Sequence, residues 1–329
     1  MSGQNPNNRG RGPGEFELIE RYFAPLSGPG AFNLGDDGAV LTPRPGEQLV
    51  FTADAIIAGV HFLAADPGDQ VAEKLVGVNL SDLAAMGAKG LGYLITTAWP
   101  RDVSLAWIAA FADGLGRAQA AHDIYLLGGD TVATDGPLSL SLTAIGTVPQ
   151  GSALRRNGAG IGDGIYVSGL IGDAGVGLRI LRDGMAGGDD IDRHEALDRY
   201  RRPKPRLQLG QALRGLASAC IDVSDGLVAD LGHLSEQSKA CMRIDLAKVP
   251  LSPLAGLIGG AMAAVTAGDD YELLFTAPAE NEARVQAAAR EAGVAITLIG
   301  RVDGGQGVEV LDDQGQPIPI SHRGYRHFR

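Results

Sequence analysis

The chain has 329 residues, of which 45% are hydrophobic, and it carries a formal net charge of −11. This charge argues against general binding to nucleic acid and against attraction to anionic membranes. It is compatible with small polyanionic substrates, provided that metal ions bridge them to the protein.

Cysteine content and hydrophobic runs indicate the compartment. The chain contains two cysteines, Cys220 and Cys241, and no CxxC pair, which favours buried, unbridged thiols in a reducing, cytoplasmic location. No apolar run approaches the ~18 residues that a membrane-spanning helix needs. Residues 1–13 are polar, lack the apolar region of a signal peptide and are predicted to form a disordered tail.

Strands and helices alternate along the first half of the chain. The predicted elements are a helix at 15–25, a strand at 48–54, a helix at 69–86, a strand at 91–99, a helix at 104–121, a buried strand at 124–130 and a half-exposed strand at 137–148. A glycine-rich stretch at 149–164 then interrupts the pattern. We place a domain boundary there, with one α/β domain at 14–150 and a second at 151–329.

The second half repeats this alternation. The predicted elements are a strand at 164–170, a helix near 174–183, an irregular charged stretch at 183–206, a helix at 206–218, a turn and helix within 220–238, and strands at 271–277, 295–302 and 307–312. The whole pattern predicts an α/β protein of two domains with mixed sheets. The residues do not indicate a function for 184–205.

Acidic residues recur in both halves in one context, at a predicted strand end or glycine turn. They are Asp36, Asp37, Asp54, Asp130, Asp222, Asp225, Asp269 and Asp270. Asp82 differs, because it lies in the apolar stripe of the 69–86 helix, where a charge needs a partner. A single Asp in a turn is commonly a turn or cap residue, and we read Asp36 in this way. Taken together, the carboxylates predict a site where Mg²⁺ bridges substrate phosphates.

Several familiar nucleotide and metal motifs are absent from the sequence. These are the GxxxxGK[ST] loop, the HRD and DFG pair of protein kinases, HExxH and the EF-hand loop. Arg155 and Arg156 precede a glycine-rich turn, where a guanidinium could fork onto a phosphate or lie on a solvated surface. His61 follows the strand that carries Asp54, and ordinary packing remains the alternative to a binding role.

Eight segments, in order from about residue 14 to 328, resemble the thiamine-monophosphate kinase family of the aminoimidazole-ribonucleotide synthetase superfamily. They read GEFELIERYF, GDDGAVL, TADAIIAGVHF, VNLSDLAAMGA, LLGGDT, IDVSDGLVADLGHL, GDDYELLFT and GYRHF. The resemblance implies a two-domain synthetase-like architecture and dimers that pair through the sheets of their N-terminal domains. It also implies the reaction of ATP with thiamine monophosphate to give ADP and thiamine diphosphate, with Mg²⁺.

The resemblance also implies roles for individual residues. Ligands of several Mg²⁺ ions would be Asp37, Thr52, Asp54, Asp82, Asp130, Asp222 and Asp225; contacts to ATP would come from Gly129, Asp130, Arg156 and Ser224; contacts to the thiamine substrate would come from His61, Asp269 and His322. Three positions depart from the family pattern. Ala53 replaces a residue that often carries a hydroxyl, Asp269 replaces the commoner Glu, and His322 stands where an aromatic residue often lies.

The expected chemistry needs no general base. The second pKa of a phosphate monoester is about 6, so the acceptor is mostly a dianion at neutral pH. We therefore expect direct in-line transfer, with metal ions neutralising two polyanions.

Two kinds of alternative remain. One is another enzyme of the same superfamily, of which aminoimidazole-ribonucleotide synthetase stays possible. Selenophosphate synthetase would need a reactive Cys or selenocysteine near the N-terminal glycines, and this chain has none there. The hydrogenase-maturation relative typically ends in Cys, whereas this chain ends in HFR. The other is a binding protein on the same scaffold, which would bind the ligands without turnover.

Overall fold

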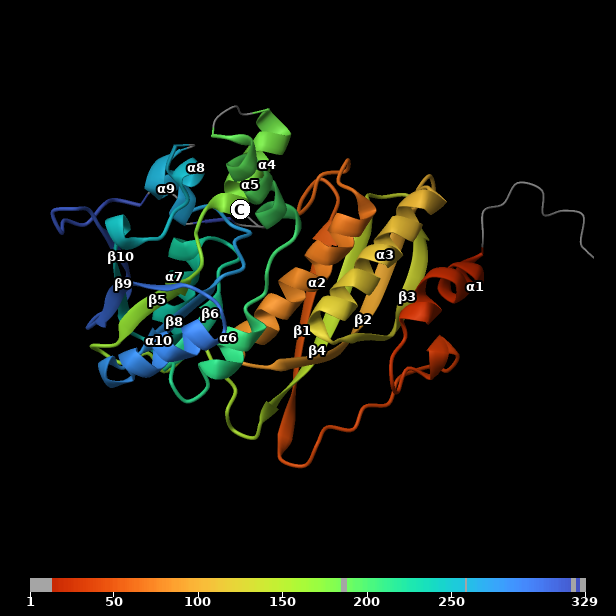
Figure 1. Cartoon of the computed structure of the whole chain (residues 1–329), viewed down its shortest axis with the longest axis horizontal. Helices are drawn as coiled ribbons and strands as arrows, with labels where there is room; N and C mark the ends of the chain where they lie inside the picture. Colours follow the sequence, from red (N-terminus) through yellow and green to blue (C-terminus); the bar gives the residue numbers. More distant parts are fainter. Residues whose placement is uncertain (1–13, 185–187, 258, 321–323, 326–329) are drawn as a thin grey trace, which may run out of the picture.

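The structure is a computed structural model that describes residues 14–184, 188–257, 259–320 and 324–325. The described residues form two sheets, one from each half of the chain, and helices cover both (Figure 1). The predicted tail at 1–13 and His322 lie outside the described residues. Among the described helices, none is both long enough and apolar enough to cross a membrane.

The first sheet has four strands in the order β1-β4-β2-β3, and only the β2–β3 pair in it is parallel. The strands are β1 (Glu47–Ile57), β2 (Lys89–Pro100), β3 (Tyr125–Thr134) and β4 (Ser139–Pro149). Helices α2 (Gly68–Ala85) and α3 (Leu105–His122) cover one face of this sheet (Figure 1). The chain reaches β1 through α1 (Glu15–Leu18), the π-helical turn Ile19–Phe23 and the 3₁₀ turns Ala24–Leu26 and Phe32–Leu34.

The second sheet has six strands in the order β10-β7-β9-β5-β8-β6, antiparallel except for the β10–β7 pair. The strands are β5 (Gly164–Ser168), β6 (Ala219–Asp222), β7 (Cys241–Asp245), β8 (Leu273–Ala277), β9 (Ile296–Asp303) and β10 (Gly307–Leu311). The helices of this half are α4 (Asp173–Asp183), α5 (Asp190–Arg201), α6 (Leu207–Ala212), α7 (Leu227–Ser238), α8 (Pro253–Leu257), α9 (Gly260–Val265) and α10 (Glu282–Glu291), with 3₁₀ turns at Leu246–Lys248 and Ala279–Asn281. Both sheets are mixed, which confirms the predicted fold class.

Helix α2 lies between the two halves of the molecule and is buried on almost every side. The sequence pattern predicted one apolar stripe, but a second face meets the C-terminal half. Gly77 lies on that face, where an added Cβ would be 2.9 Å from the carbonyl oxygen of Pro203. Ser81, one turn further on, is 0% exposed. Small and polar residues on this face let the second half of the chain pack closely against the helix.

Several sequence predictions differ from the structure. The strands predicted to end at Asp54 and Asp130 continue to Ile57 and Thr134, because pairing with neighbouring strands extends beyond these carboxylates. The stretch at 183–206 is not irregular, since it contains α5. That helix buries only Ala196 and Tyr200, and most of its other residues are charged, so its pattern looked solvated.

The helix predicted at 206–218 is only the six residues of α6. The sequence pattern predicts a turn where β6 lies, and it predicts no element for β7, α8, α9 or α10. The two thiols behave as expected: Cys220 and Cys241 are both buried and unbridged.

Candidate functional site

A cavity of about 580 Å³ opens where β1 and α2 meet α7 and the 155–157 loop. Three of the predicted site residues line it: Thr52, Asp82 and Arg156. Thr52 comes from β1 of the first sheet, Asp82 from α2, and Arg156 from the glycine-rich stretch between the two sheets. The cavity therefore joins elements from both halves of the chain.

Strand β1 and helix α2 hold the first side of the site together. Along β1, Thr52 and Asp54 alternate with exposed neighbours and face the helix. The Thr52 hydroxyl donates a hydrogen bond to the Asp82 carboxylate. The Asp54 backbone N–H donates to Asn79 Oδ1 at 3.0 Å. Burial raises the pKa of Asp82, while the Thr52 hydrogen bond and the Arg156 charge oppose that rise.

Asp222, at the end of β6, supplies the second side. Its carboxylate is buried, with the residue 3% exposed, and accepts a hydrogen bond from Ser81 Oγ at 2.7 Å. Burial and the nearby charges of Asp82 and Asp54 raise the pKa of Asp222 to about 7, against the opposing effects of the Ser81 hydrogen bond and of Arg156. Three carboxylates thus gather in a poorly solvated place, where their mutual repulsion favours a bound cation.

The turn after β6 brings together Asp225, Asp230 and His233. One ligand atom of each lies within 4.8 Å of the others. Asp230 Oδ2 accepts the backbone N–H groups of Ser224, Asp225 and Gly226 at 3.1 to 3.2 Å, so this carboxylate fixes the shape of the turn. Burial, followed by the charges of Asp222 and Asp225, raises its pKa to about 8.

Asp269 lies beside the turn after β6, since its backbone N–H donates to the Ser224 carbonyl at 2.9 Å. Burial raises the pKa of the neighbouring Tyr271 hydroxyl, and the charges of Asp269, Asp222 and Asp54 all add to that rise. The Tyr271 hydroxyl donates to Asp269 Oδ1 at 3.1 Å. His61 lies four residues after Ile57, whose backbone N–H donates to His61 Nδ1 at 3.1 Å. This bond requires Nδ1 to be an acceptor, so the proton of the neutral ring is on Nε2.

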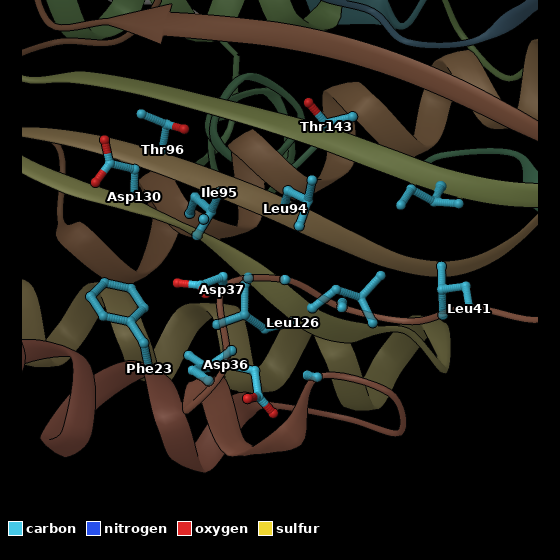
Figure 2. Close-up of a pocket in the computed structure, with 18 of the residues that line it drawn as sticks. Phe23, Asp36, Asp37, Leu41, Leu94, Ile95, Thr96, Leu126, Asp130 and Thr143 are labelled. Atoms are coloured by element: carbon cyan, nitrogen blue, oxygen red, sulfur yellow. The ribbon is translucent and has the colours of Figure 1, made fainter.

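Three other predicted site residues lie apart from this site in the structure: Asp37, Gly129 and Asp130. They line a cavity of about 600 Å³ on the outer face of the first sheet, opposite α2 and α3. Figure 2 shows Asp37 on a loop facing the strands that carry Thr96 and Asp130, while the Asp36 carboxylate points away from those strands. Asp36 and Asp37 are both exposed.

Asp54 and Asp130 are too far apart within one chain to share an ion. Asp54 lies in register with Leu142, Ile95 and Gly129, so three strand spacings, or about 14 Å, separate it from β3. The two side chains also leave opposite faces of the sheet. Ligands of one Mg²⁺ lie only about 2 Å from the ion. The predicted ligands therefore form two separate groups in the described chain.

Gly129 has a reason of its own to be glycine. Its φ is +150°, and an added Cβ would lie 1.7 Å from the carbonyl oxygen of Ile95. The close approach of β2 and β3 thus requires glycine here, whatever else its backbone contacts.

Sequence reasoning missed several polar residues beside the site. Ser81 stands within the NLSD segment, and Asp230 and His233 are three residues apart on one face of α7, a spacing that could have revealed them. Lys74 gave no such signal, because its partner Asp269 is 195 residues away. Only folding brings that pair together.

Comparisons with known families agree with this architecture. Residues 35–148 match the family model described as AIR synthase related protein, N-terminal domain, and residues 160–313 match the corresponding C-terminal domain. Together they cover most of the chain. The fold is therefore that of an AIR synthase related protein.

Individual relatives indicate which family of AIR synthase related proteins the chain belongs to. A thiamine-monophosphate kinase from Caulobacter vibrioides is 42% identical over 326 residues, covering 96% of this chain and 91% of the relative. The crystal structure of a thiamine-monophosphate kinase from Stenotrophomonas maltophilia is 42% identical, with a TM-score of 0.79 over 87% of this chain and 91% of that one. A structure of AaThiL complexed with AMPPCP and TMP is 30% identical, with a TM-score of 0.77 over 89% and 91% of the two chains. The chain belongs to the thiamine-monophosphate kinase family.

The buried carboxylates predict an unusual pH dependence for the metal-free protein. The pKa of Asp222 is about 7 in the folded chain and 3.8 in a free side chain, so between about pH 4 and pH 7 the folded state binds a proton that the unfolded state has released. Stability should then fall as pH rises through this window. In EDTA, Asp222→Asn should have a Tm roughly 3–8 °C above that of the unsubstituted protein at pH 8, and the difference should shrink at pH 4.5.

Differential scanning calorimetry at both pH values checks this expectation. Asp313→Asn is the matched control, since it removes the same charge from an exposed residue. A Tm difference for Asp222→Asn that stays constant between the two pH values would contradict the proposed origin.

Proposed function

We propose that the chain transfers the γ-phosphoryl group of ATP to thiamine monophosphate, giving thiamine diphosphate and ADP in an Mg²⁺-dependent reaction in the cytoplasm. The observation that carries this proposal is the convergence of Asp54, Asp82 and Asp222 beside Arg156 at the junction of the two sheets. The thiamine-monophosphate kinase relatives, and the AaThiL structure with AMPPCP and TMP, support the choice of substrates.

The donor set fits Mg²⁺. Thr52, Asp54, Asp82 and Asp222 offer hard oxygen atoms. Burial is the main cause of the raised pKa of Asp222, and the neighbouring carboxylates add a repulsion that a bound cation would relieve. These residues, with Asp225 from the adjoining turn, would hold the ions. When bound, Mg²⁺ supplies positive charge that offsets the phosphates of both substrates.

The protein residues orient the two substrates. Arg156 lies in the same cavity as Asp82, where its guanidinium can donate two hydrogen bonds to phosphate oxygens. Ser224 lies on the turn that Asp230 fixes, which would place its hydroxyl against the nucleotide. The acceptor phosphate is already a dianion at neutral pH, so the chain needs no general base and transfer proceeds directly in line.

The acceptor's organic part would lie against His61 and Asp269. His61 presents Nε2–H, because its Nδ1 accepts from Ile57. Asp269 presents a carboxylate whose side chain is 31% exposed. A carboxylate suits the cationic thiazolium ring of thiamine, and an N–H donor suits its polar substituents. His322 stays a predicted substrate contact.

The first test measures ADP release from ATP and Mg²⁺, with identification of the phosphorylated product. We expect turnover with thiamine monophosphate, none with free thiamine or aminoimidazole precursors, and loss of turnover in EDTA. Turnover with an aminoimidazole precursor instead would assign the chain to the synthetase branch. Binding of ATP without turnover on any of these substrates would favour a binding protein.

Asp82 should be needed for turnover more than for folding. Asp82→Asn keeps the shape of the side chain and the Thr52 hydrogen bond but removes the negative charge that faces the cations. We expect kcat to fall by about 100-fold or more, with a Tm close to that of the unsubstituted protein. Asp113→Asn, at an exposed position of α3, is the control and should keep full activity. Full activity of Asp82→Asn would show that the metal site lies elsewhere.

We also propose that two copies of the chain pair through the outer face of the first sheet. This face carries exposed apolar side chains from three strands: Phe51 on β1 is 61% exposed, Leu94 on β2 is 39% and Val132 on β3 is 45%. Phe51 and Leu94 also line the 600 Å³ cavity on this face, and exposed apolar side chains that gather on one face are typical of a contact with another protein. Asp130 lies on the same face, so pairing of two copies through this face would also determine which groups its carboxylate can contact.

A charge on this face should separate the copies. We expect light scattering to give twice the 34.0 kDa chain mass for the unsubstituted protein and one chain mass for Leu94→Glu, since the glutamate would be buried unpaired. Leu257→Glu makes the same change at an exposed position of α8 and should stay dimeric. A dimeric Leu94→Glu protein would exclude this face as the contact.

A further inference from the structure

Lys74 of α2 is a buried lysine whose position the reaction as described does not explain. The residue is 2% exposed. Its Nζ donates to Asp269 Oδ2 at 2.9 Å and to the carbonyl oxygen of Tyr200 at 3.0 Å. The same Nζ lies 3.9 Å from the centroid of the Tyr200 ring. A carboxylate, a carbonyl and an aromatic face thus replace the water that this ammonium group loses.

The partner carboxylate is held from two sides. Asp269 Oδ2 accepts from Lys74, and Asp269 Oδ1 accepts from the Tyr271 hydroxyl. The backbone is fixed as well: the Asp269 N–H donates to the Ser224 carbonyl at 2.9 Å, and the Tyr271 N–H donates to that of Val223 at 2.8 Å. Asp269 and Tyr271 have φ of +71° and +49°, a conformation that costs energy outside glycine.

Lys74 and Ser81 lie seven residues apart on one face of α2, or about 10 Å along the helix axis. Ser81 holds Asp222, and Lys74 holds Asp269. The helix therefore sets the spacing between a carboxylate of the phosphate end and the carboxylate of the organic end. That spacing is what a substrate with a phosphate at one end and a cationic ring at the other would need.

Stability alone does not account for this lysine. A buried ion pair is often no more stable than an apolar pair of the same shape, because desolvation offsets the attraction. What an ion pair adds is orientation: Lys74 and Tyr271 together leave one arrangement for the Asp269 carboxylate. Its side chain, 31% exposed, is fixed while still reachable by a ligand.

We infer that Lys74 is a positioning residue for the phosphate acceptor, holding the Asp269 carboxylate against the cationic organic part of thiamine monophosphate. This inference rests on the proposed function. Lys74 itself touches no substrate and acts only through Asp269. The same lysine also donates to the Tyr200 carbonyl, which connects the C-terminal end of α5 to this ion pair.

The test is a double-mutant cycle on the full-length chain, read as steady-state KM for each substrate. Lys74→Met should raise KM for thiamine monophosphate about tenfold. KM for ATP and kcat should each stay within about threefold of their values in the unsubstituted protein. Asp269→Asn should do the same. The double variant should be no worse than the worse single variant, because both remove one interaction.

Arg201→Met is the matched control. Arg201 Nε donates to Asp66 Oδ1 at 3.0 Å and joins the same end of α5 to the first half of the chain, without touching Asp269. We expect a lower Tm and unchanged ratios of the two KM values. Lys74→Gln, which keeps a donor but no charge, is used in place of Lys74→Met if the latter does not fold, and should give an intermediate KM.

Three results would overturn the inference while leaving the proposed function intact: equal changes in both KM values for the Lys74 variants, additive effects in the double variant, or the same substrate-selective change in Arg201→Met. An unsubstituted protein that does not phosphorylate thiamine monophosphate would overturn both the inference and the proposed function.

Discussion

The packing of α2 between the two sheets is the constraint on which the rest of the structure depends. One face of this helix meets its own sheet, where Asn79 binds the backbone of Asp54. Another face meets the C-terminal half through Ser81 and Asp222. Since the helix is rigid over 18 residues, its two faces fix where β1 stands relative to β6. Carboxylates from separate halves of the chain can then meet only in one place.

That meeting place is electrostatically unfavourable by itself. Asp54, Asp82 and Asp222 share a site with little solvent, and part of the cost appears as the raised pKa of Asp222. Hydrogen bonds from Thr52 and Ser81 and the charge of Arg156 offset only some of it. A fold that keeps such a cluster gives up stability for the capacity to hold cations, and phosphoryl transfer between two polyanions is a reaction that uses this capacity.

At the other end of the site, the ion pair of Lys74 and Asp269 is a second contact that α2 makes with the C-terminal half. The ion pair joins α2 to the 268–271 turn, and the backbone of that turn is pinned to the strand end that carries Asp222. The segment at 184–205, for which the sequence indicated no function, contributes through α5. Its Tyr200 carbonyl shares the lysine, and Arg199 pairs with the fully buried Glu272. One charged stretch thus holds the two halves of the molecule together.

Local patterns were sufficient for most elements and for the nature of the chemistry. Period-two and helical patterns predicted β1, α2, β2, α3 and β4, because apolar residues recur in each of these at the spacing of a strand or of a helix. They failed for α5, whose two buried side chains are outnumbered by charged ones, and they placed the ends of β1 and β3 too early. In a sequence, a carboxylate after an apolar run indicates the end of a strand. In the structure, the end of a strand is decided by its pairing with neighbouring strands, which is a tertiary interaction.

The sequence by itself determined the family, the mixed α/β class and the oxygen-rich character of the site, since these depend on residue types and their order. Only the tertiary structure decided which residues meet. It placed Thr52 and Asp222 beside Asp82 and set Asp37 and Asp130 on another face of the first sheet. It also paired Lys74 with an aspartate 195 residues away. Spacing along the chain carries no information about such contacts, because the distance between two side chains is set by how helices and sheets pack.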